Sequence, residues 1–215
     1  MEKVKILFAM ATIVFSIIAG CSKAQKSSGN TTGKPAATVI NGNKKILIVY
    51  LSRTNNTRAI AQIIQKQVGG KLVALELVNP YPRNYQAIVQ QVVAENESGF
   101  LPPLKTKIDS IAKYDVVFVG FPTWGMKLPP PVKSFLHQYN LDGKIVIPFN
   151  TNAGYGVGSS FDTVKQLCPN SKVLEGYSTK GGIERDGVYF VIAGEKEKQV
   201  TNEIKMWLQR VKLLN

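Results

Sequence analysis

Residues 52–57 combine three hydroxyl groups, two side-chain amides and one guanidinium group in a single short segment. This segment separates an apolar run from an amphipathic pattern, so we expect it to connect a strand to a helix. The first N–H groups of a helix lack partners within the helix, and the helix dipole is positive there. Such a helix start binds phosphate, whereas an ordinary cap requires only one polar residue. The sequence therefore favours a phosphate loop, formed by Ser52, Arg53, Thr54, Asn55, Asn56 and Thr57.

The elements that position this loop alternate between two patterns. Apolar runs at residues 46–51, 116–119 and 145–149 predict strands that are covered on both faces, and residues 72–77 and 173–177 predict strands nearer the edges. Amphipathic patterns between these runs predict helices. The alternation predicts parallel strand–helix–strand units and an open sheet with helices on both faces. Residues 187–193 are a candidate for an additional strand.

Ligands in such sheets bind beyond the carboxyl ends of the strands. The segment at residues 50–58 reads Tyr-Leu-Ser-Arg-Thr-Asn-Asn-Thr-Arg and resembles the FMN-phosphate motif of flavodoxins, Ser/Thr-x-Thr-Gly-Asn-Thr. Asn55 stands where that family has glycine, and asparagine is the other residue that readily adopts a positive φ. Three further motifs resemble a flavodoxin-like subfamily: Tyr81-Pro82-Arg83-Asn84-Tyr85, Pro122-Thr123-Trp124 and Cys168-Pro169.

This resemblance implies a three-layer αβα sandwich around a five-stranded parallel sheet in the order 2-1-3-4-5, with FMN as the cofactor. The loop at residues 52–57 would hold the phosphate. Two other loops would flank the flavin ring, where Trp124 and Tyr155 are suited to stacking. The residues concerned are Pro122, Thr123, Trp124 and Gly125 in one loop, and Asn152, Ala153, Gly154, Tyr155 and Gly156 in the other. Asn152 and Ala153 replace a histidine and a glycine pair that the subfamily often carries there.

Other chemistries find little support in the sequence. His137 is the single histidine, so we expect no zinc site of the usual kinds. There is no Gly-x-Ser-x-Gly motif of a hydrolase. The predicted first and third strands end without the acidic residues that a phospho-receiver domain requires. Simple electron transfer requires no catalytic side chain, and we assign none.

The amino-terminal residues predict export. The apolar run at residues 6–19 follows a charged start and is too short to span a bilayer. It ends in Ile18-Ala19-Gly20-Cys21, which resembles the lipobox of bacterial lipoproteins. We therefore expect a signal peptide at residues 1–20, a lipidated Cys21 with a flexible tether to residue 43, and a domain at residues 44–215. Cys168 would then be the one remaining thiol, and a buried one.

The sequence favours an FMN-binding redox protein anchored in the bacterial cell envelope, on the periplasmic side or at the cell surface. Ser22 after the cysteine favours the outer membrane. The charge of +13 is scattered without interleaved aromatic residues, which argues against nucleic acid. Two interpretations remain: attraction to anionic lipid or an acidic partner, and solvated surface lysines with no partner. The electron acceptor would be a small molecule such as a quinone, and the donor a membrane protein or quinol. The alternative is a flavodoxin-fold binding or adaptor lipoprotein that no longer binds flavin.

Overall fold

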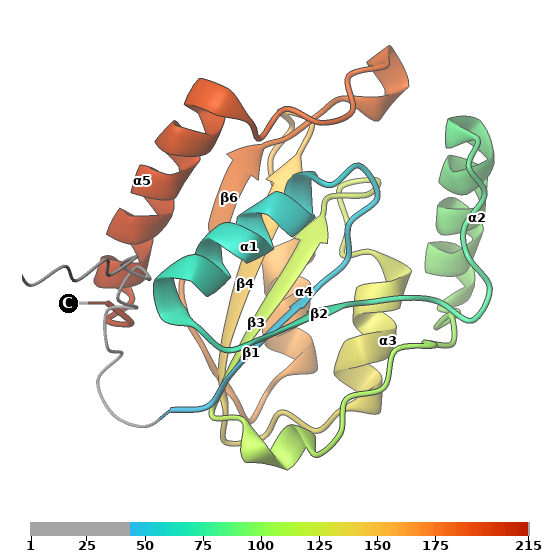
Figure 1. Ribbon diagram of the computed structural model, residues 1–215. Coiled ribbons are helices and arrows are strands. Elements are labelled where there is room, and N and C mark those ends of the chain that lie inside the picture. Colours follow the sequence, from blue (N-terminus) through green and yellow to red (C-terminus); the bar gives the residue numbers. More distant parts are fainter. Residues whose placement is uncertain (1–43, 215) are drawn as a thin grey trace, which may run out of the picture. The chain divides into compact units, whose positions relative to one another are not determined.

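A parallel β-sheet forms the middle layer of the domain in this computed structural model, which describes residues 44–214 (Figure 1). The predicted signal peptide, lipidated Cys21 and tether lie outside the described residues. The elements in chain order are β1 (Ile46–Tyr50), α1 (Asn56–Val68), β2 (Lys71–Ala74), α2 (Tyr85–Ser98), η1 (Ile111–Lys113), β3 (Val116–Pro122), α3 (Pro130–Gln138), β4 (Ile145–Asn152), α4 (Ser160–Leu167), β5 (Lys172–Val173), β6 (Tyr177–Lys180), η2 (Glu184–Asp186) and α5 (Gly194–Arg210).

The sheet order is β2-β1-β3-β4-β5, which confirms the predicted order, and every pairing is parallel. β6 also pairs with β4, further along it than β5 does. The three purely apolar runs became β1, β3 and β4, which are central because each has neighbours on both sides. Their order brings the loops after β1, β3 and β4 to one edge of the sheet.

The prediction of an additional strand at residues 187–193 was wrong, because the extra strand is β6. Within residues 187–193, only Val188 has a β-type partner, an isolated antiparallel bridge to Ile183. The side chains of Val188, Tyr189 and Phe190 are about half exposed. An apolar run usually indicates a buried strand, but here most of the run lies at the surface.

Two helical layers cover the sheet. α1 and α5 pack on one face, where Ile60, Ile64 and Trp207 are buried in one hydrophobic cluster. α3 and α4 pack on the other face, where Phe135 and Val164 belong to a second cluster. α2 lies beside α3 and away from the sheet (Figure 1). None of the helices among the described residues is long and apolar enough to cross a membrane.

Cys168 at the end of α4 is buried, as expected from the sequence. Burial, together with the nearby charge of Asp142, raises the pKa of its thiol from 9.0 to about 11. The thiolate is the reactive form of cysteine, so this thiol should be inert at neutral pH.

We predict that in a Cys21→Ser background Cys168 reacts with a chromogenic disulfide reagent at pH 8 only after unfolding. Because the folded-state pKa is raised, ionisation favours the unfolded chain. The free energy of unfolding should therefore fall, relative to a Cys168→Ala variant, as pH rises from about 9 to about 11. Fast labelling of the native protein would contradict the burial of this thiol.

Candidate functional site

The loop between β1 and α1 is built around a left-handed turn. Asn55 has φ 64° and ψ −3°, so it adopts the positive φ expected where flavodoxins have glycine. Its side chain makes no capping hydrogen bond, and the first turn of α1 contains no acidic residue. Within residues 44–214, the backbone N–H groups of residues 54–57 have no hydrogen-bond partner. The loop therefore presents a cluster of free donors at the positive end of a helix dipole.

Several polar side chains of this loop are already bonded within the protein. The Asn56 amide donates to Thr54 Oγ1 at 2.9 Å, and its oxygen accepts from the Val191 N–H at 3.0 Å. The Thr57 and Thr151 hydroxyls are hydrogen-bonded at 2.8 Å in a buried position. Ser52 Oγ accepts from the Arg58 N–H. These side chains hold the loop in shape, which leaves the backbone N–H groups, the Asn55 amide and the Thr54 hydroxyl as the available donors.

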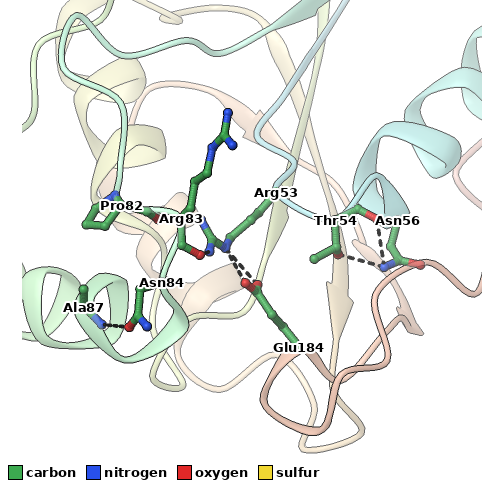
Figure 2. Close-up of polar contacts among 8 residues, drawn as sticks. All are labelled: Arg53, Thr54, Asn56, Pro82, Arg83, Asn84, Ala87 and Glu184. Atoms are coloured by element: carbon green, nitrogen blue, oxygen red, sulfur yellow. Dashed lines mark hydrogen bonds and ion pairs between the residues drawn. The ribbon is translucent and has the colours of Figure 1, made fainter.

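Arg53 connects the loop to two distant parts of the chain (Figure 2). Its Nε donates to both carboxylate oxygens of Glu184, at 2.7 and 2.9 Å. Its terminal nitrogens donate to the carbonyl oxygens of Pro82 and Arg83, at 2.9 and 2.6 Å. The sequence predicted that this guanidinium group binds the cofactor. In the structure it instead joins three segments of the chain, namely its own loop, residues 82–83 and the segment of Glu184.

Residues 181–191 form a strap that lies over the start of α1. The Gly181 N–H donates to the carbonyl oxygen of Asn152 at 2.8 Å, and Asn56 donates to the Tyr189 carbonyl. A Cβ atom at Gly182 would lie 2.0 Å from that carbonyl oxygen, so only glycine permits the close approach. No pattern in the sequence indicated that this segment belongs to the site, where it contributes Glu184.

The loops after β3 and β4 are bonded to each other. The Thr123 hydroxyl donates to the Gly156 carbonyl at 3.0 Å, and Asn152 Oδ1 accepts from the Gly154 and Gly156 N–H groups. Gly158 has φ +54°, and a Cβ atom there would lie 2.1 Å from the Met126 carbonyl oxygen. The two loops therefore form one connected wall rather than two independent flaps.

The aromatic residues of these loops differ in exposure. Trp124 is partly buried and packs edge-on against Tyr81, with 5.5 Å between ring centroids. Tyr155 is 68% exposed. It also interacts with Arg185, whose pKa is raised by its ion pair with Asp186 and by Tyr155. Trp124 is held in place, whereas most of the Tyr155 side chain faces solvent.

A cleft brings most of the predicted site residues together. Its first hollow lies at the start of α1 and is lined by Arg53, Thr54, Asn56, Thr57, Pro122, Thr123, Trp124, Asn152 and Ala153, among others. Its second hollow lies between the two wall loops and is lined by Gly125, Tyr155 and Gly156, again with Thr123, Asn152 and Ala153. Tyr85 and Glu184 line both hollows, although the sequence assigned neither to the site. Ser52 borders a separate hollow, and Asn55 and Gly154 line none of these three.

In the described part of the chain, no three His, Cys, Asp or Glu side chains are grouped so that they could hold a metal ion. The cleft instead combines a cluster of unpaired backbone N–H donors, a partly buried indole and two adjoining hollows that share several lining residues. This arrangement is suited to an anionic ligand with a flat ring.

The family model for flavodoxin matches residues 45–192. The chain belongs to the flavodoxin family. Its fold matches a protein of Bacteroides eggerthii assigned as a flavoprotein, with 28% identity and a TM-score of 0.62, over 78% of this chain and 97% of that chain. A second such protein, from Bacteroides uniformis, has 23% identity and a TM-score of 0.62, over 76% and 99% of the two chains.

A flavoprotein of Lactobacillus acidophilus, solved in complex with FMN, has the same fold. It has 20% identity and a TM-score of 0.58, over 67% of this chain and 98% of that chain. No curated protein matches the sequence. The flavodoxin family model includes the loops after β1, β3 and β4 and the whole strap, and it ends just before α5.

We predict that Asn55→Ala lowers the free energy of unfolding by about 1 kcal/mol, whereas Asn55→Gly preserves it, because only glycine and asparagine readily adopt a positive φ. Urea unfolding measures both. The matched control is Asn202, which is exposed within α5. There the order should reverse, because glycine is worse than alanine inside a helix. Equal stability of Asn55→Ala and the wild type would contradict the left-handed turn.

We also predict that Arg53 and Glu184 are energetically coupled. Their side chains are only 20% and 17% exposed, so a double-mutant cycle with Arg53→Gln and Glu184→Gln should give a coupling of about 1–2 kcal/mol. The control is Lys105 and Glu76, which are 71% and 62% exposed and should couple by less than about 0.5 kcal/mol. Equal coupling energies in the two pairs would show that the Arg53–Glu184 pair is no stronger than an ordinary surface ion pair.

Proposed function

We propose that this protein binds FMN and acts as a redox protein, either carrying electrons or reducing a small acceptor such as a quinone. The observation that carries this proposal is the cluster of unpaired N–H groups at residues 54–57, which opens into a cleft walled by the loops of Trp124 and Tyr155. The flavodoxin family membership and the FMN complex of the Lactobacillus acidophilus relative support the same cofactor.

The residues of the cleft fit FMN at both ends. The N–H groups of residues 54–57 and the Thr54 hydroxyl are placed to hold the phosphate, which favours the start of a helix that lacks acidic residues. Trp124 and Tyr155, which belong to the two bonded wall loops, would flank the ring. FMN would supply the redox chemistry, because it accepts and releases electrons.

The Glu184 carboxylate lies beside the proposed phosphate site, and neighbouring positive charges offset its repulsion of a phosphate. Glu184 lines both hollows, but Arg53 donates two hydrogen bonds to it and offsets its charge. Lys180, which lies close to Gly154, adds positive charge beside the cleft. A cationic environment stabilises an anionic cofactor by Coulomb attraction.

We further propose that the protein works at a membrane surface of the bacterial cell envelope, anchored through a lipid on Cys21. The apolar run and Cys21 of the amino-terminal sequence support this location, and Ser22 favours the outer membrane. No nicotinamide cofactor pool exists outside the cytoplasm, so the electrons would come from a membrane protein or a quinol.

The second candidate is a flavodoxin-fold adaptor that has lost flavin. One observation favours it: the Asn56 amide, a donor in the phosphate motif, is bonded to the strap and to Thr54. The visible spectrum separates the two candidates. A purified protein that is colourless and takes up no added FMN would rule out the redox function.

We predict that Thr54→Val weakens FMN binding about tenfold, because it removes a hydroxyl that can bond to a charged phosphate. Thr54→Ser should restore most of the affinity. The measurement is quenching of FMN fluorescence during titration with protein. Thr163→Val is the control, because the hydroxyl of Thr163 on α4 bonds to the Ser159 carbonyl, away from the cleft. Equal losses for Thr54→Val and Thr163→Val would place the phosphate elsewhere.

A further inference from the structure

An apolar groove runs between α2 and the loop after β3, and its exposed valines have no packing role in the core. The sequence pattern places Ile88, Val89, Val92 and Val93 on one helical face, but only Ile88 and Val92 are buried. Val89 is 42% exposed and Val93 is 47% exposed, and all four residues line the groove. An apolar surface that remains hydrated is costly unless a ligand or partner covers it.

The volume and the lining of the groove suit a single small ring. Its volume is about 180 Å³, somewhat larger than the 150 Å³ or so that accommodates a benzene molecule in an engineered cavity. Val89 and Val93 line the α2 side, while Trp124 lines the opposite side and Tyr85 stands at the start of α2. Aliphatic and aromatic walls of this kind favour a flat, apolar ring.

The polar groups of the groove lie mainly on its loop side and at the end of α2. Lys127 lines it and makes no ion pair within residues 44–214, so its ammonium group is available to a carbonyl oxygen. Asn96 also lines the groove, but it is bonded to Lys133 at 2.7 Å. A ligand with an apolar ring and an oxygen acceptor at its edge suits this combination.

The groove is continuous with the proposed flavin cleft. Arg53, Tyr85, Thr123, Trp124 and Glu184 line both the groove and the first hollow of the cleft. These shared residues include the Arg53–Glu184 ion pair (Figure 2). A molecule in the groove would therefore lie next to a cofactor in the cleft.

We propose that this groove is the binding site for an oxidised quinone ring. The assignment rests on the proposed redox function, because adjacency to a flavin is what distinguishes a quinone from other flat apolar molecules. The ring packs between Val89 and Val93 on one side and Trp124 on the other, and Lys127 donates to a carbonyl oxygen.

The test is calorimetric titration of the full chain with a short, water-soluble naphthoquinone, with and without FMN. Val93→Asp should weaken quinone binding at least tenfold, because it places a charge in the apolar wall. Ala94→Asp is the matched control, since it adds the same charge at an exposed position of α2 that does not line the groove. This control should bind the quinone as the wild type does. Val89→Asp should repeat the loss at a second position.

The outcomes separate this site from the flavin proposal. Unchanged FMN affinity in Val93→Asp, with weakened quinone binding, supports a distinct groove site. Quinone binding by a chain that takes up no FMN would overturn the redox function but leave the groove as the site. Equal quinone affinity in Val93→Asp and the wild type would overturn the groove site, as would complete loss of quinone binding on addition of FMN. Equally tight binding of a short fatty acid would show that the groove does not select a ring.

Discussion

The backbone N–H groups of residues 54–57 at the start of α1 have no partners within the described residues, and none of the neighbouring side chains bonds to them. Unpaired backbone donors are unfavourable unless water or a ligand satisfies them. The polar side chains that could cap the helix form other hydrogen bonds. Asn56 bonds to the strap and Thr57 bonds to Thr151, so neither takes up the free donors. Asn55 completes the turn with a positive φ and no capping bond.

The strap depends on the same loop. Residues 181–191 are attached to the loop by Arg53 through Glu184 and by Asn56 through the backbone of Tyr189 and Val191. Without these bonds, the Glu184 carboxylate would repel an anion in the cleft, and the Asn56 amide would be a further donor to it. The Arg53–Glu184 pair is also partly shielded from water, which strengthens the attraction between its charges. The bonds of Arg53 and Asn56 therefore hold the strap beside the cleft and also set the charge of the groups that line it.

The walls of the cleft follow from how the loops after β3 and β4 are joined. Parallel pairing of β3 with β4 brings Phe121 opposite Asn150 and Pro122 opposite Thr151, so both loops start from the same edge. The hydrogen bond from Thr123 to Gly156 and the close approach of Gly158 to Met126 then connect the two loops. A rigid wall of this kind limits the conformational entropy that a bound ring would have to overcome. α2 stands outside this wall, which is why a groove remains between them.

The sequence by itself determined the sheet and the turn. Continuous apolar runs placed β1, β3 and β4 in the centre, because a strand covered on both faces contains few polar residues. Amphipathic patterns indicated helices, and α1 and α5 each bury one face against the sheet. Asn55 at a glycine position indicated a positive φ. These features are local, so they leave a pattern in consecutive residues.

Only the tertiary structure decided which groups meet across the site. Arg53 and Glu184 are 131 residues apart, and Asn56 and Val191 are 135 apart, so no periodic pattern connects either pair. The apolar run at residues 188–190 indicated a strand, yet it lies half exposed in the strap. Val89 and Val93 shared the pattern of a buried face, but α2 is packed beside α3 rather than against the sheet. Hydrophobic periodicity reports how a segment prefers to be buried, whereas hydrogen bonds and grooves depend on where distant segments come together.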